Sequence, residues 1–190
     1  MSKITSRDKL LDATFREVYM YGYAGSSTAN ILKIAAVPKG SMYHYFASKK
    51  EMVVAMIKER LVPKVREDFF IEINDDSRGL EIIEYLFKKI SNNRMLVKHG
   101  CPLHKLMFEM GSLDDEITEL CYAEYLYMCD NFSKVIELGI RQKTIKDINS
   151  TSLAQHIITA SWGALSIPPK YASKEQFLKD TNNILEFIKV

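Results

Sequence analysis

Apolar residues recur along this chain of 190 residues at intervals of three and four, which places them on one face of an α-helix. Near the start, Leu11, Phe15 and Val18 follow this spacing, and the pattern returns in every later segment. Alternation with a period of two, which indicates β-strands, persists nowhere. The sequence therefore predicts an all-α fold of about nine helices. They are expected at about residues 6–21, 27–35, 38–46, 49–73, 80–90, 102–110, 113–138, 151–167 and 174–188.

Capping and breaking residues mark several of these boundaries. Ser48 stands three residues before Glu51, which is the S-x-x-E pattern of a capping box at a helix start. Gly22 and Gly139 follow apolar-periodic segments and are predicted to end the first and seventh helices. Pro63 lies inside the fourth helix, where a bend is expected because proline has no N–H to donate.

The composition limits the class of protein. Hydrophobic residues make up 47% and charged residues 26% of the chain, as in soluble globular proteins. No window approaches eighteen apolar residues and the start lacks the apolar region of a secretory signal, so no membrane span and a cytoplasmic location are expected. The three cysteines are odd in number and irregularly spaced, which argues against a disulfide framework and fits a reducing compartment.

Charge is distributed unevenly along the chain. Residues 1–50 contain eight Lys or Arg and three Asp or Glu, which gives a net charge of +5. The net charge of the whole chain is +2, so the other residues carry −3. A basic first quarter suggests a polyanionic partner for that part of the protein. Taken alone, the same asymmetry also fits a chance distribution of surface lysines.

Residues 37–46, VPKGSMYHYF, combine a proline, a glycine, a lysine and a histidine with three aromatic rings. Such a segment leaves too little apolar face for a core helix. Together with the preceding helix and the break at Ala36, it forms the outline of a helix-turn-helix motif. The second helix of that motif enters the major groove of DNA by its N-terminal end.

The residue types of this short helix suit a DNA contact. Lys39 can reach a guanine edge or a phosphate, and His44 can donate to either. Hydroxyl groups of Ser41 and Tyr43 can donate to phosphate oxygens, which position a protein on the duplex. Gly40 allows the backbone to approach the partner closely.

The segments LLDATFREVYMYGY and SSTANILKIAAVPKGSMYHYFASKKEM resemble the DNA-binding domain of the TetR family of bacterial repressors. The resemblance is close over residues 7–55 and rests on the pattern V-x-K-G-x-x-Y-x-Y-F-x-S-K-x-E. It implies a helix-turn-helix domain over residues 1–47 and a ligand-binding and dimerisation domain over residues 48–190. By this resemblance, the DNA-contact positions are Ser27, Thr28, Lys39, Gly40, Ser41, Tyr43, His44 and Lys49.

Two positions depart from the family pattern. Ala36 stands where the family often has glycine, and Pro38 where it often has serine. An alanine in the turn is expected to strain it slightly. The PKGS variant is similar to that of one subgroup, so the resemblance holds.

Residues 100–103, GCPL, and 161–165, SWGAL, are similar to a subgroup whose members sense reactive or unsaturated compounds, which implies that Cys101 is a redox or electrophile sensor. Nearby lysines and histidines, with a helix start at Pro102, would favour a thiolate. The alternative is a small buried residue at a helix junction. Other aromatic and methionine side chains could line a ligand pocket or pack an ordinary core: Phe69, Phe87, Met107, Phe108, Tyr125 and Trp162.

Metal binding and catalysis receive less support. His99, Cys101 and His104 fall within six residues, but their spacing is not a standard zinc pattern, so no metal and no cofactor are predicted. No motif offers a nucleophile with its base or a pair of catalytic carboxylates, and an all-α enzyme is therefore disfavoured. A TetR-like protein that binds DNA without an inducer remains an alternative to a regulated repressor.

The last two helices are predicted to form a homodimer. Their apolar residues have little of the monomer left to pack against, and two copies would make a four-helix bundle with twofold symmetry. Such a dimer would place two recognition helices about 34–36 Å apart, or farther by whole turns of DNA. The expected partner is therefore double-stranded DNA with a near-palindromic operator, and the inducer is unknown.

Overall fold

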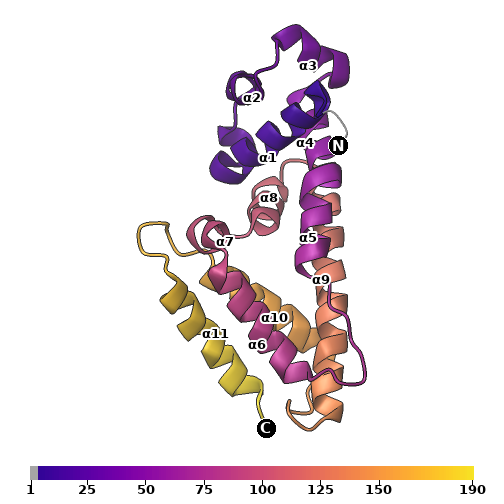
Figure 1. The fold of residues 1–190 in the computed structure, drawn as a ribbon, viewed down its shortest axis with the longest axis vertical. Helices are drawn as coiled ribbons and strands as arrows, with labels where there is room; N and C mark the ends of the chain where they lie inside the picture. The colour runs from indigo at the N-terminus through magenta and orange to yellow at the C-terminus, as the bar shows by residue number, and fades with distance from the viewer. Residues whose placement is uncertain (1–3) are drawn as a thin grey trace. The chain divides into compact units, whose positions relative to one another are not determined.

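The computed structural model describes residues 4–190, whose regular elements are helices, and the predicted all-α fold is confirmed (Figure 1). Within this range, Ile145 and Lys189 form an isolated β-bridge. The helices are α1 Ser6–Gly25, α2 Thr28–Ala35, α3 Lys39–Tyr45, α4 Lys49–Met56, the π-helix η1 Ile57–Leu61, α5 Val62–Asp68, α6 Gly79–Asn92, α7 Arg94–His99, α8 Pro102–Met110, α9 Asp115–Arg141, α10 Ser150–Ala164 and α11 Lys174–Ile188.

The chain forms two compact units. Unit 1 combines the chain up to residue 68 with residues 102–124, and unit 2 combines residues 69–101 with residues 125–190. Unit 1 thus contains α8, which lies outside the predicted DNA-binding domain in sequence but packs against α1. A functional boundary after residue 47 stays a prediction.

The core of unit 1 forms around α1, which contacts α2, α3, α4, η1 and α8. Leu10 and Leu11 of α1 and Ile31 of α2 are fully buried, and each contributes about 1.5–3 kcal/mol by leaving water. Phe46, which follows α3, is 2% exposed. The Arg7 guanidinium of α1 lies 5.4 Å from the centre of the Phe46 ring, so this side chain holds the end of α3 against the first helix.

Two predicted helix starts are confirmed by their caps. The Ser27 hydroxyl accepts a hydrogen bond from the backbone N–H of Asn30 at 3.0 Å. Ser48 accepts one from the N–H of Glu51 at 3.0 Å, and the Glu51 carboxylate reaches back to the N–H of Ala47 at 2.7 Å. These bonds satisfy N–H groups that have no partner inside their own helices.

The fourth predicted helix is a continuous helical stretch from α4 through η1 to α5, and it ends at Asp68 rather than near residue 73. Near Pro63, where a bend was predicted, the structure has a π-helical turn over Ile57–Leu61. Proline donates no N–H, so the Glu59 carbonyl loses its α-helical partner. It accepts instead from Nη1 of Arg60 at 3.2 Å.

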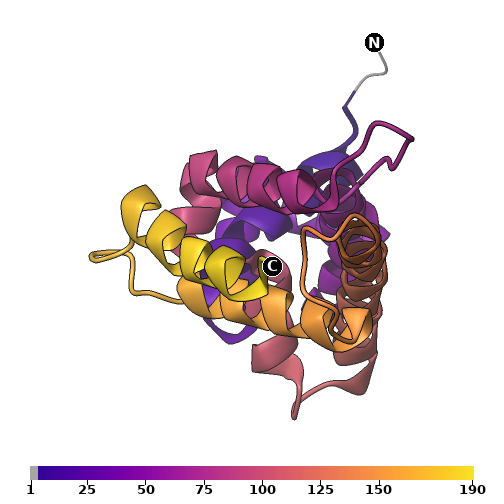
Figure 2. The ribbon, with the colours of Figure 1, turned by 90° about the horizontal axis from the view of Figure 1, so that it is seen from below.

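In unit 2, α11 contacts both α6 and α10, and these helices run side by side (Figure 2). Their buried residues include Ile83, Phe87, Ile157 and Phe177. No helix within residues 4–190 is long and apolar enough to cross a lipid bilayer.

Two predictions in this part of the chain were wrong. Helix α9 continues through Gly139 to Arg141. Gly139 is required for packing, since a Cβ there would lie 2.4 Å from Cδ1 of Ile145. The short helix α7, capped by Asn93, was also missed because six residues are too few to show an apolar period.

Candidate nucleic-acid interface

Helices α2 and α3 are joined by a tight turn. Ala36 adopts a left-handed conformation, with φ 52° and ψ 44°, and the Val37 N–H donates to the Leu32 carbonyl at 3.2 Å. Pro38 is the N-cap of α3, and its carbonyl accepts a hydrogen bond from the Ser41 N–H at 3.0 Å. The helix-turn-helix outline and the strained alanine are both present, because a side chain at positive φ crowds the following carbonyl oxygen.

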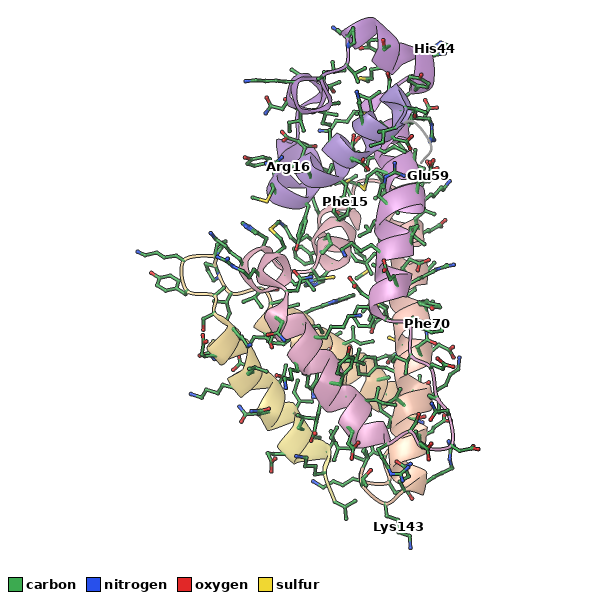
Figure 3. The ribbon with its side chains drawn as sticks, in the orientation of Figure 1. Phe15, Arg16, His44, Glu59, Phe70 and Lys143 are labelled. Atoms are coloured by element: carbon green, nitrogen blue, oxygen red, sulfur yellow. The ribbon has the colours of Figure 1, made fainter. Side chains whose placement is uncertain are left out.

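Helix α3 has one buried and one exposed face. Met42 and Phe46 point into unit 1 with 1% and 2% of their surfaces exposed. Tyr43 is 55% exposed, and His44 projects from the outer end of α3 (Figure 3). A Cβ built on Gly40 would meet no atom within 4 Å, so this part of the helix faces open space.

The other predicted DNA-contact residues differ in accessibility. Lys39 and Ser27 are exposed, and Ser27 is also the N-cap of α2. Thr28 and Ser41 are half-buried. The exposed and half-buried positions gather at the first turns of α2 and α3, while a DNA contact by each of them stays a prediction.

Lys49 has a role that the sequence did not predict. Its ammonium donates to the backbone carbonyls of Tyr23 and Ser26, the second at 2.6 Å, and lies 4.6 Å from the centre of the Tyr23 ring. Burial lowers the pKa of this amine. Two of its three N–H donors are used in holding the end of α1. A phosphate contact by Lys49 therefore stays a prediction that depends on its third donor.

Residues 22–26, the kinked end of α1 and the residue after it, are called here the link between α1 and α2, and they are held by Glu109 of α8. Its Oε2 accepts from the Tyr23 N–H at 2.6 Å, and its Oε1 from the Ala24 N–H at 2.7 Å. Gly22 allows this geometry with φ 76° and ψ 178°, a conformation that is almost restricted to glycine. The sequence analysis assigned no role to Glu109 and missed this contact.

An ion-pair cluster joins the first half of α1 to η1. Arg7 donates to both carboxylate oxygens of Glu59, at 2.6 and 2.5 Å. Arg60 donates to Asp8 at 2.9 Å and to Asp12 at 2.6 Å. The Thr5 hydroxyl and then Arg60 hold the pKa of Asp8 at about 2, below its ordinary value of 3.8.

The predicted ligand and sensor residues are divided between the two units. Phe69, Phe87, Cys101, Tyr125 and Trp162 belong to unit 2, and Met107 and Phe108 to unit 1. The rings of Tyr125 and Trp162 lie 5.3 Å apart. Phe108 is 84% exposed, so it can line a pocket only where something else covers it. A pocket built from these residues stays a prediction.

Unit 1 contains a small cavity of about 10 Å³. Such a cavity has room for about one water molecule and is too small for an organic ligand. Phe15 reaches it from the side of α1 that faces α8 (Figure 3). None of the predicted ligand residues is among its lining, which consists of Phe15, Val18, Tyr19, Met56, Leu61, Pro102 and Leu106.

The cysteines differ in burial. Cys121 and Cys129 are buried in α9, and burial raises the pKa of the Cys129 thiol. Cys101 is half-buried. Across residues 4–190 the structure brings no three His, Cys, Asp or Glu side chains together in an arrangement that could hold a metal ion.

Residues 10–56 match the family described as "Bacterial regulatory proteins, tetR family". This segment of the chain is therefore similar to the TetR family. It is 28% identical over 148 residues to the HTH-type transcriptional regulator LmrA of Bacillus subtilis, a match that covers 75% of this chain and 74% of LmrA. The HTH-type transcriptional repressor NemR of Escherichia coli K12 is 42% identical over 53 residues, covering 28% of this chain and 27% of NemR.

A third relative, an uncharacterised regulator of Lactococcus lactis, is 29% identical over 117 residues, and the match covers 58% of each protein. The chain thus spans less than two thirds of that relative's length. The TetR fold is confirmed by solved structures. Reduced E. coli NemR aligns with a TM-score of 0.81 at 22% identity, over 97% of this chain and 98% of that one. A TetR regulatory protein of Rhodobacter sphaeroides aligns with a TM-score of 0.83 at 20% identity, over 96% and 98%.

Proposed function

We propose that this protein is a DNA-binding transcriptional regulator of the TetR family, most simply a repressor, that acts as a homodimer on a near-palindromic operator. The observation that carries this proposal is the two-faced helix α3. Its apolar side chains are buried in unit 1, while Lys39, Tyr43 and His44 are exposed next to a tight turn. This arrangement falls within the segment that matches the family.

The dimensions of α3 suit the major groove of DNA. Seven residues at about 1.5 Å each make a helix about 10 Å long, and the groove is about 12 Å wide. In the proposed complex Lys39 contacts a guanine edge or a phosphate, and the Tyr43 hydroxyl donates to a phosphate. The net charge of +5 over residues 1–50 attracts the duplex before these contacts form.

The proposed dimer forms through α10 and α11. Support comes from the exposed side of this helix pair, where Phe187 is 60% exposed and its ring lies 6.5 Å from that of His156. A Cβ built on Gly163 of α10 would meet no atom within 4 Å, so a second helix could approach there closely. A twofold dimer would present two α3 helices to two half-sites.

Release from DNA is proposed to follow binding of a small molecule in the body of the protein or modification of Cys101. Either event would shift the population towards a state in which the two recognition helices are wrongly spaced. With Cys101→Ser, a mild electrophile or peroxide should no longer release DNA, whereas wild type should release it reversibly. If both proteins hold DNA under these conditions, Cys101 is structural.

The test of the proposed function uses a duplex that wild-type protein selects from random-sequence DNA. Fluorescence anisotropy then compares Lys39→Ala with Lys88→Ala, which removes the same charge from an exposed position on α6. Loss of a base or phosphate contact should weaken binding by Lys39→Ala about 10- to 100-fold, and Lys88→Ala should bind like wild type. Equal affinities of the two variants, or failure of wild type to select any sequence, would contradict the proposal.

A further inference from the structure

Helix α8 packs against the predicted DNA-binding helices although it lies far from them in the sequence. The chain leaves unit 2 after residue 101, contributes residues 102–124 to unit 1, and returns to unit 2 at residue 125. Both ends of this excursion are therefore covalently continuous with unit 2. Helix α8 touches α1, which in turn touches α2, α3 and α4.

Two side chains of α8 replace one broken hydrogen bond of α1. In an uninterrupted helix the N–H of Tyr23 would donate to the carbonyl of Tyr19. The extended ψ of Gly22 interrupts the helix. The Tyr23 N–H donates to Glu109 at 2.6 Å, and the Tyr19 carbonyl accepts from Nζ of Lys105 at 2.7 Å. Lys105 and Glu109 are four residues apart, so they lie on the same face of α8.

The link between α1 and α2 is consequently held between two opposite charges. Glu109 binds its N–H groups at Tyr23 and Ala24, and Lys49 of α4 binds its carbonyls at Tyr23 and Ser26. Helix α2 begins directly after this link, with Ser27 as its cap. The conformation of residues 22–26 therefore sets the angle at which α2 and α3 leave α1.

We propose that Glu109, assisted by Lys105, is a positioning residue for operator binding, and that it makes the helix-turn-helix motif sensitive to the position of α8. Helix α8 acts on the link between α1 and α2 through Glu109. This contact of α8 with the link does not pass through the continuous helical stretch from α4 to α5. The inference rests on the proposed function, because it assigns a role in DNA binding to a residue that does not touch DNA.

The sign of the effect separates this role from simple electrostatics. Removing the charge of Glu109 makes unit 1 more positive, which by itself strengthens binding to a polyanion. Positioning predicts the opposite result. In Glu109→Gln one carboxylate oxygen becomes an NH₂ group that cannot accept from a backbone N–H, so one of the two bonds to the link is lost.

The experiment measures binding of Glu109→Gln to the duplex selected by wild type, by anisotropy over a range of salt concentrations. The matched control is Glu119→Gln, which removes the same charge from an exposed position on α9 in unit 1. Glu109→Gln should bind about tenfold more weakly, because the fraction of the protein in the binding-competent conformation should fall to about one tenth. Glu119→Gln should bind as well as wild type or more tightly. Lys105→Met should weaken binding in the same direction as Glu109→Gln.

Two further readouts distinguish positioning from loss of folding. The slope of log affinity against log salt should stay unchanged, because the number of phosphate contacts is the same. Hydrogen exchange should accelerate in peptides that cover residues 19–26 and stay unchanged over α4. Circular dichroism at the binding temperature establishes that each variant is folded.

The outcomes separate the two proposals. If wild type selects a duplex and Glu109→Gln binds it like Glu119→Gln, the positioning role is wrong and the proposed function stands. If Glu109→Gln binds more weakly and the slow hydrogen exchange over α4 is also lost, the variant is generally unfolded. This result would also overturn the positioning role. If wild type selects no duplex, the proposed function fails, and the role of Glu109 fails with it.

Discussion

Replacing Gly22 by alanine should destabilise unit 1 by about 3–6 kcal/mol. A non-glycine residue at φ 76° and ψ 178° carries backbone strain of about 1–3 kcal/mol. The new Cβ would also lie 2.6 Å from Oε2 of Glu109. Oε2 can retreat only by giving up its bond to the Tyr23 N–H, and a hydrogen bond to a charged group contributes about 1.5–3 kcal/mol.

Thermal and urea unfolding, followed by circular dichroism, measure this cost. For a chain of this size about 1 kcal/mol corresponds to about 2–4 °C, so the midpoint should fall by about 6–24 °C. Gly25→Ala is the matched control in the same helix. Its Cβ would lie 3.3 Å from Cβ of Tyr21 at an ordinary φ, and its effect should stay within about 1 kcal/mol.

A double-mutant cycle with Glu109→Ala isolates the contact. Without the carboxylate, alanine at position 22 should cost only the backbone strain of about 1–3 kcal/mol. The reasoning is refuted if Gly22→Ala costs less than about 1 kcal/mol, or if its cost is the same with and without Glu109.

Three further changes test separate parts of the account. Ala36→Gly should raise the unfolding midpoint by about 1–4 °C, because it relieves the left-handed alanine, and a lower midpoint would show that the turn is unstrained. Gly40→Ala should stabilise α3 by up to about 1 kcal/mol yet weaken binding to the selected duplex, and unchanged binding would show that DNA does not approach this glycine closely. The low pKa of Asp8, about 2 against an ordinary 3.8, means that its carboxylate stabilises the fold above about pH 4 and that this contribution is lost as the pH falls towards 2. Asp8→Asn should therefore flatten the acid branch of a plot of unfolding midpoint against pH, whereas an unchanged branch would contradict the ion-pair assignment.

The sequence was sufficient for features that depend on local spacing. The N-cap predicted at Ser48 is confirmed, because a cap bonds to an N–H only two or three residues away. Gly22 was expected to stop the first helix, and the backbone does depart from helical geometry there. Pro102 opens α8 as expected.

Contacts between distant backbone and side-chain groups could not be predicted. Glu109 binds N–H groups 85 and 86 residues away, and backbone N–H groups leave no trace in the sequence. Lys49 was predicted to contact DNA, and its bonds to two backbone carbonyls were not foreseen, because a lysine at a helix start does not reveal which way its ammonium turns. Phe108 was grouped with pocket residues by its type alone, and it is 84% exposed.

The symmetry of the DNA that the wild-type protein selects from a random pool tests the central claim most directly. A dimer that presents two α3 helices should enrich an inverted repeat whose half-site centres are about 34–36 Å apart, or farther by whole helical turns. Lys39→Ala should enrich that repeat poorly. A pool that stays random, or an enriched site without twofold symmetry, would contradict the account.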